Sequence, residues 1–195
     1  MAHGLLLVLS GPSGVGKTTI AHELIRRFGG HFSVSCTTRS PSTGERDGVD
    51  YHFISEGSFA AMVKDDAFLE HATVFGRSSY GTPREPVERS LHAGELVILD
   101  IDVQGAEQVH TKVPDMLGIF ILPPDEDSLL ARLRQRGRED EAAIQRRFAE
   151  ARREMDRARG NSVYDAFVVN DDLPGAIEQV AELVGARLGR LQASS

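Results

Sequence analysis

The stretch that decides the fold is Leu5–Thr19, LLLVLSGPSGVGKTT, close to the start of the chain. Its first five residues are apolar, which predicts a strand buried on both faces, as in a parallel sheet. The strand runs into GPSGVGKT, residues 11–18, which matches the pattern G-x-x-x-x-G-K-[ST] without a mismatch. A helical segment, TTIAHELIRRFGG, follows directly. Strand, glycine loop and helix in this order predict a site that holds phosphate groups.

The residue types of this loop indicate how phosphates would be held. Glycines let successive backbone N–H groups turn toward one anion. Lys17 adds positive charge toward the outer phosphates, and the Thr18 hydroxyl is placed to ligate Mg²⁺. The residues expected to contact the phosphates of the bound nucleotide are Gly11, Pro12, Ser13, Gly14, Val15, Gly16, Lys17, Thr18 and Thr19.

Composition limits the class of protein. The chain has 195 residues, 41% of them hydrophobic, which suits one domain with a sizeable core. A net charge of −7 argues against a nucleic-acid polymer as partner. No apolar run approaches the roughly 18 residues of a membrane span, and no signal peptide is recognisable. With Cys36 as the only cysteine, no intrachain disulfide can form, so we expect a cytoplasmic protein.

Three further buried strands are predicted, in residues 95–103, 116–123 and 165–170. Helical patterns separate them, and strands that alternate with helices predict an α/β fold with a parallel sheet flanked by helices. Two regions depart from this rhythm. Residues 35–91 hold short strands and turns, and residues 132–159 contain ten arginines against six acidic residues.

Two carboxylates follow the second predicted strand, in VILDID. Asp100 has the position at which phosphate-loop enzymes hold Mg²⁺ or its waters, and we expect it to be a metal ligand with Thr18. Asp102 lies two residues on, so on a continuing strand both carboxylates would face one site. No N-K-x-D sequence is present to read a base as a GTPase does, and the further motifs of helicase or transporter ATPases are absent. A nucleotide kinase, with a second site for its acceptor, fits best.

In order along the chain, SGPSGVGKTT, SCTTR, GERDGVDYHF, FLEHA, YGTP, LDIDVQGA, ILPP, RLRQRG and VVND resemble the motifs of guanylate kinases. The resemblance covers residues 5–184. It implies transfer of the γ-phosphoryl group of ATP to GMP with Mg²⁺, in purine nucleotide metabolism. It also implies a single domain with a core (1–34, 92–131 and 160–195), a GMP-binding region (35–91) and a helical lid (132–159).

The resemblance also implies roles for single residues. Glu70 would read guanine, because a carboxylate accepts from both the N1–H and the amino donors of that base. The residues implied to bind GMP are Ser35, Arg39, Tyr51, Glu70, Tyr80, Thr82 and Asp102. On the donor side Arg136, Arg147 and Asn170 would lie near the phosphates and adenine of ATP. The expected catalytic residues are Lys17, Arg39, Arg136 and Arg147. We expect most other arginines of residues 132–159, such as Arg152, Arg153, Arg157 and Arg159, to be solvated.

The sequence departs from the family pattern in the acceptor region. Ser42 replaces a second arginine that usually faces the GMP phosphate, and the turn before YGTP carries Arg77 in place of asparagine. Our hypothesis is that Arg77, or else Arg46, supplies the missing charge. Two alternatives stay open at this point: a kinase for ribose bisphosphates on the same scaffold, and a guanylate-kinase-like module that binds proteins. Neither needs the combination of an intact phosphate loop with Glu70, Tyr51 and Tyr80.

Overall fold

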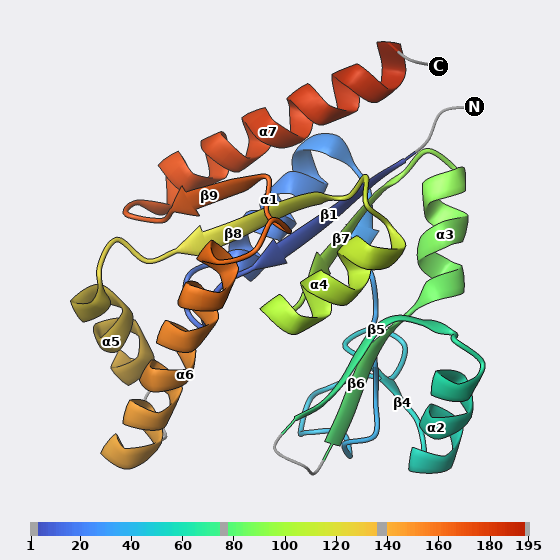
Figure 1. Ribbon diagram of the computed structural model, residues 1–195, viewed down its shortest axis with the longest axis horizontal. Coiled ribbons are helices and arrows are strands. Elements are labelled where there is room, and N and C mark those ends of the chain that lie inside the picture. The colour runs from blue at the N-terminus through green and yellow to red at the C-terminus, as the bar shows by residue number, and fades with distance from the viewer. Residues whose placement is uncertain (1–3, 75–77, 136–139, 194–195) are drawn as a thin grey trace.

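A five-stranded parallel sheet forms the centre of the molecule (Figure 1), in the order β2-β7-β1-β8-β9. The structure is a computed structural model that describes residues 4–74, 78–135 and 140–193. The five strands are β1 (Leu5–Ser10), β2 (His31–Phe32), β7 (Leu96–Asp100), β8 (Leu117–Leu122) and β9 (Ala166–Val169). The predicted α/β fold is confirmed, and all four predicted strands are present. Only β2 escaped prediction, since two residues on a sheet edge carry no periodic signal.

Helices cover this sheet and close its core. α1 (Lys17–Phe28) and α7 (Leu173–Ala193) pack against each other and against the sheet. α3 (Arg84–His92) contacts β7, and α4 (Val103–Lys112) contacts β1. Every residue of β1 and β8 is buried, as expected for strands covered on both faces. The carboxyl ends of these parallel strands therefore meet at one edge, where ligands of open α/β sheets bind.

A second sheet lies apart from the first, below it in Figure 1, with strands in the order β4-β3-β6-β5. Its elements are β3 (Cys36–Thr37), β4 (His52–Phe53), α2 (Glu56–Lys64), β5 (Phe68–Val74) and β6 (Ser78–Pro83). Helix α2 was not expected in this part of the chain. A small apolar cluster of Cys36, Phe59 and Phe68 holds it to the sheet, so this unit has a core of its own.

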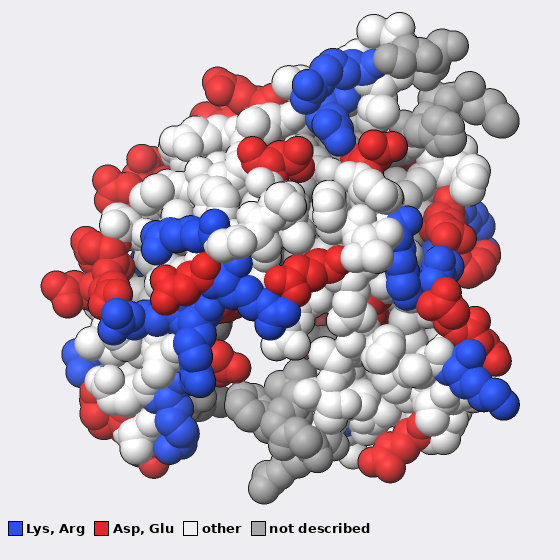
Figure 2. Space-filling view, in the orientation of Figure 1, with Lys and Arg blue, Asp and Glu red and all other residues white. Residues whose placement is uncertain are grey.

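Two helices that pack against each other follow β8 along the chain, α5 (Glu126–Gln135) and α6 (Glu141–Arg159). The Asp140 side chain begins α6 by accepting a hydrogen bond of 2.7 Å from the backbone N–H of Ala143. Figure 2 shows the molecular surface hollowed between this helix pair and the second sheet, with arginines gathered over α6. Within the described residues no helix combines the length and the apolar character of a membrane span.

Candidate active site

The glycine loop between β1 and α1 opens onto a cavity of about 300 Å³. Its lining residues are Ser13, Gly14, Gly16, Lys17, Thr18, Thr19 and Asp100. Gly14 and Gly16 have φ angles of 91° and 94°, a left-handed backbone that other residues adopt only with strain. The loop ends directly at the N-terminus of α1, where free backbone N–H groups and the helix dipole favour anions. The cavity therefore has the geometry of a phosphate site.

Lys17 stands within the curl of this loop. Its ammonium group donates hydrogen bonds to the carbonyl oxygens of Gly11 at 2.6 Å and Pro12 at 3.3 Å. It also lies 3.6 Å from Oδ1 of Asp100 at the end of β7. Burial raises the pKa of Asp100, and the neighbouring Lys17 charge opposes that rise. The predicted lysine, hydroxyl and carboxylate thus come from two elements and meet at one cavity.

Asn170 contacts the backbone of the glycine loop. Its side-chain Nδ2 donates to the carbonyl oxygen of Val15 at 2.8 Å, and the asparagine is buried. A Cβ atom on Gly16 would lie 2.7 Å from this nitrogen, so the loop packs tightly on it. The structure therefore places Asn170 under the phosphate loop, with its donor group used there. The expected contact with adenine stays a prediction.

Asp100 and Asp102 face different cavities. β7 ends at Asp100, and Asp102 is the N-cap of α4, whose Oδ1 accepts from the backbone N–H of Gly105 at 2.7 Å. The expectation that both face one site assumed a continuing strand. Asp100 lines the loop cavity and Asp102 lines a cavity beside α6, so the expectation that both face one site stays a prediction.

Glu70 lies buried on β5, with 6% of its surface exposed. Thr82 is opposite on β6, and its hydroxyl donates to Glu70 Oε1 at 2.6 Å. Burial raises the pKa of this carboxyl, while the Thr82 hydrogen bond lowers it. Thr82 was expected to bind GMP, which stays a prediction, and in the structure its hydroxyl bonds to Glu70. One carboxylate oxygen is thus fixed by Thr82.

A second cavity, of about 320 Å³, separates the two sheets. Three predicted acceptor-site residues line it, namely Ser35, Tyr51 and Thr82, and Asp100 closes it toward the loop cavity. Asp100 also lines the loop cavity, so the two cavities adjoin at one carboxylate. Two ligands could therefore approach each other at the end of β7.

Arg39 is held from several directions. Its Nε donates to the Tyr80 hydroxyl at 3.2 Å, and its Nη1 and Nη2 donate to the two carboxylate oxygens of Glu45 at 2.8 Å each. The guanidinium carbon lies 5.4 Å from the centre of the Tyr51 ring. Because Tyr80 accepts from Arg39, its own hydroxyl hydrogen stays available for another acceptor. Arg39, Tyr51 and Tyr80 therefore form one cluster, and their contact with GMP stays a prediction.

Glu45 was not anticipated. It lies six residues after Arg39 in an irregular turn, where no periodicity links the two. Hydrogen bonds from Arg39, and then from the Ser42 backbone, lower the pKa of Glu45 to about 2. The Ser42 hydroxyl also contacts the Arg39 guanidinium at 3.1 Å. Within the described residues of the cluster, the charge of Arg39 is thus balanced by an internal carboxylate.

Of the other arginines predicted to lie at the site, the structure places Arg147 at the phosphate loop. Arg147 on α6 donates to the Ser13 hydroxyl at 2.8 Å, which brings this helix to the phosphate loop. Arg136 and Arg77 lie outside the described residues. Arg46 is exposed.

The arginines of α6 that were expected to be solvated are exposed, namely Arg152, Arg153, Arg157 and Arg159. Two of them pair with neighbouring helices, Arg152 with Glu126 and Arg157 with Glu107.

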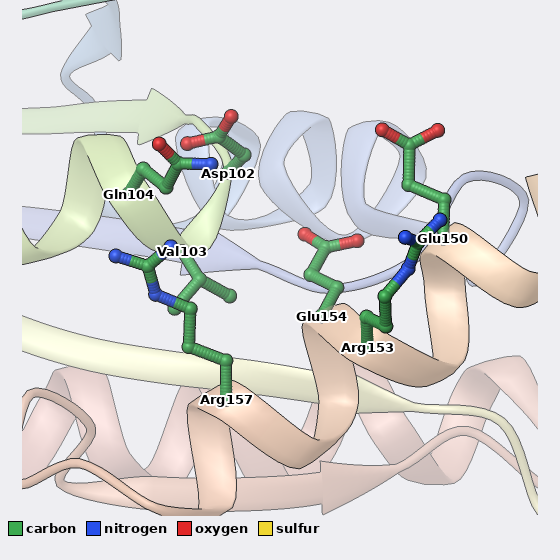
Figure 3. A pocket seen from close by; sticks show the side chains of 7 residues that line it. All are labelled: Asp102, Val103, Gln104, Glu150, Arg153, Glu154 and Arg157. Carbon is green, nitrogen blue, oxygen red and sulfur yellow. The ribbon is translucent and has the colours of Figure 1, made fainter.

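Glu154 is a second residue that the sequence did not single out. It projects from α6 into the cavity beside Asp102, which has a volume of about 410 Å³ (Figure 3). Burial raises the pKa of Glu154 to about 7, and the nearby carboxylates of Asp102 and Glu150 act in the same direction, while Lys17 opposes them. In sequence it is one of many acidic residues on an Arg/Glu-rich helix, so only the packing of α6 distinguishes it.

This environment predicts a pH-dependent effect of Glu154→Gln on stability. The folded pKa of about 7 exceeds the ordinary 4.5, so the folded state binds the proton more tightly and loses stability as pH rises between these values. We expect the variant to match wild type near pH 4.5 and to unfold with a free energy higher by up to about 3 kcal/mol at pH 8. Urea unfolding at both pH values measures this.

The matched control is Asp156→Asn, which removes an exposed carboxylate of α6 that does not act on the pKa of Glu154. It loses the same charge without relieving a buried one. Equal effects of both substitutions at pH 8, or a Glu154→Gln variant that is less stable than wild type there, would contradict the prediction.

Comparisons with known proteins point to one family. A family model described as guanylate kinase matches residues 3–187. A relative from Desulfitobacterium hafniense, named guanylate kinase, is 44% identical over 191 residues, which cover 97% of this chain and 94% of that protein. A relative of the same name from Anaeromyxobacter dehalogenans is 48% identical over 183 residues, which cover 93% and 80% of the two proteins.

Solved structures give the same result. A guanylate kinase from Anaplasma phagocytophilum superposes with a TM-score of 0.75 at 30% identity, covering 96% of this chain and 88% of that one. The SH3-kinase fragment of tight junction protein 3 superposes with a TM-score of 0.53 at 11% identity, covering 96% of this chain and 59% of that one. At that identity the second likeness shows the fold alone.

Proposed function

The chain belongs to the guanylate kinase family of phosphotransferases, and from this premise we propose how its residues transfer the γ-phosphoryl group of ATP to GMP. The observation that carries the proposal is the meeting of two cavities at Asp100, one lined by the phosphate loop and one by acceptor-site residues. ATP takes the loop cavity and GMP the cavity between the sheets. In this proposal the donor site lies on the core and the acceptor site on the region 35–91. The helices within 132–159 form the lid over the donor phosphates.

The acceptor needs no general base, because the attacking phosphate oxygen of GMP is already ionised. The difficulty is to bring two polyanions together, so catalysis comes from positioning and charge neutralisation. Lys17 and Arg147 face the donor phosphates from the loop and from α6. Arg39, with the hydroxyls of Tyr51 and Tyr80, holds the GMP phosphate.

Mg²⁺ fits the residues at the loop. The Thr18 hydroxyl and the Asp100 carboxylate are hard oxygen donors at one cavity. The described residues hold no group of three or more metal-binding side chains, which suits an ion that takes its other ligands from phosphates and water. When bound, Mg²⁺ supplies positive charge to the transferred group. The cytoplasmic location stays a prediction.

Release of ADP in a coupled assay tests this function, with GMP, dGMP, AMP, CMP and UMP as acceptors. We expect turnover with GMP and with dGMP, and little with the other three, because adenine and the pyrimidines lack the paired donors that a carboxylate accepts. ATP binding without turnover of GMP would overturn the proposal.

Substitution of Arg39 with lysine tests the phosphate clamp. Lysine keeps the charge but cannot bond Tyr80 and a phosphate with one planar fork. We expect the KM for GMP to rise about tenfold, with the KM for ATP unchanged. Steady-state kinetics with each substrate varied in turn measures both. Arg46→Ala, in the same turn, is the control, and an equal effect there would assign the clamp charge to Arg46 as well.

A further inference from the structure

Strand β5 carries Glu70 and is the edge of the second sheet. An edge strand leaves a row of backbone N–H and C=O groups without strand partners, and proteins cover such edges. Here helix α4 of the main sheet lies against β5 (Figure 1). The placement of Glu70 relative to the core therefore depends on how α4 contacts this edge.

Gln108 on α4 makes the most directional of these contacts. Its Nε2 donates to the carbonyl oxygen of His71 at 3.0 Å, and its Oε1 accepts from the backbone N–H of His71 at 3.1 Å. A carboxamide places an N–H donor beside an oxygen acceptor, as a peptide group does, so it pairs with both backbone groups of His71 as a neighbouring strand would. His71 directly follows Glu70, so this pairing fixes the backbone at the buried carboxylate.

Two other residues on the same face of α4 support the contact. A Cβ atom on Gly105 would lie 3.1 Å from Glu70 Oε2, so the helix backbone packs directly on the carboxylate. Lys112 donates to the carbonyl oxygen of Phe68 at 2.7 Å. Residues 105, 108 and 112 are spaced three and four apart, which places them on one helix face. The N-cap of this helix is Asp102, so α4 carries Asp102 at its start and packs against Glu70 one turn later.

We propose that Gln108 is a positioning residue for base recognition, which fixes Glu70 against α4 so that both donors of an acceptor base with N1–H and a 2-amino group meet its carboxylate. This inference rests on the proposed function. Lys112 cannot replace Gln108 in this role, because an ammonium group only donates hydrogen bonds. It also donates to Asp66 at 2.9 Å. Gln108 alone among the three both donates to and accepts from one residue of β5.

The test compares GMP with IMP, which keeps N1–H and lacks the 2-amino group. The variant is Gln108→Met, which keeps the length of the side chain and removes both hydrogen bonds. We expect the ratio of kcat/KM for GMP to that for IMP to fall at least tenfold, while the KM for ATP stays unchanged. Gln108→Glu keeps the acceptor and loses the donor, and its ratio should lie between wild type and Gln108→Met.

Thr111→Ala is the matched control on the same helix, because the Thr111 hydroxyl bonds only to Glu107 within α4 among the contacts of the described chain. A wild-type enzyme that does not phosphorylate GMP would overturn the proposed function. An active wild type with an unchanged GMP-to-IMP ratio in Gln108→Met would overturn the role of Gln108. So would an equal loss with both acceptors, which is the result of a merely structural contact. If Gln108→Met does not fold, the Gln108→Glu ratio decides: a wild-type value overturns the role.

Discussion

Replacement of Lys17 with methionine is expected to lower kcat for GMP phosphorylation about a thousandfold, the loss typical of removing one preorganised charge from a transition state. Methionine keeps most of the unbranched stem and removes the only ammonium group lining the loop cavity among the described residues. The charge that develops on the transferred phosphoryl group would then lack its nearest cation. ADP release at saturating ATP and GMP measures the effect.

Lys64→Met is the matched control, because Lys64 is exposed on α2 and lines neither the loop cavity nor the cavity between the sheets. It should leave kcat unchanged. Lys17 also bonds the carbonyl oxygens of Gly11 and Pro12, so thermal unfolding of the variant is needed to show that the loop still folds. A folded Lys17→Met enzyme with kcat within tenfold of wild type would contradict the assignment.

Replacement of Glu70 with glutamine is expected to lower kcat/KM for GMP by about 10³-fold or more. The amide can still accept from Thr82, so the local fold should persist. However, its NH₂ group would face a donor of guanine in place of an acceptor, and a buried donor would stay unpaired. The KM for ATP should not change, since Glu70 does not line the loop cavity.

Kinetics with varied GMP and varied ATP separate these two effects. Glu88→Gln on α3 removes an exposed carboxylate and serves as the control. If Glu70→Gln kept the wild-type kcat/KM for GMP, the carboxylate would not read the base. If the KM for ATP rose as much as the KM for GMP, Glu70 would act on the fold and not on recognition of the base.

Features written in contiguous residues could be predicted from the sequence. The apolar run of β1, the glycine pattern and Lys17 lie in one stretch, and Asp100 ends a second apolar run. Each of these follows from local chain geometry, because strand alternation and glycine φ angles depend on near neighbours. Strand alternation does not reach Asp102, because β7 ends at Asp100 and Asp102 is the N-cap of α4.

Contacts between distant elements could not be predicted. Glu45 reaches Arg39 through an irregular turn, Asn170 lies under Val15 across 155 residues, and Gln108 bonds a strand of the other sheet. Glu154 differs from its acidic neighbours on α6 only in what the helix packs against.

The sequence by itself determined the parallel α/β sheet, the glycine loop and the side chains that line the loop cavity. Only the tertiary structure decided which carboxylate faces which cavity, how Arg39 is balanced and what holds Glu70 in place. The physical reason is the range of the interactions. Backbone conformation and burial pattern follow from neighbours along the chain, whereas hydrogen bonds and desolvation depend on elements that meet only when the core has packed.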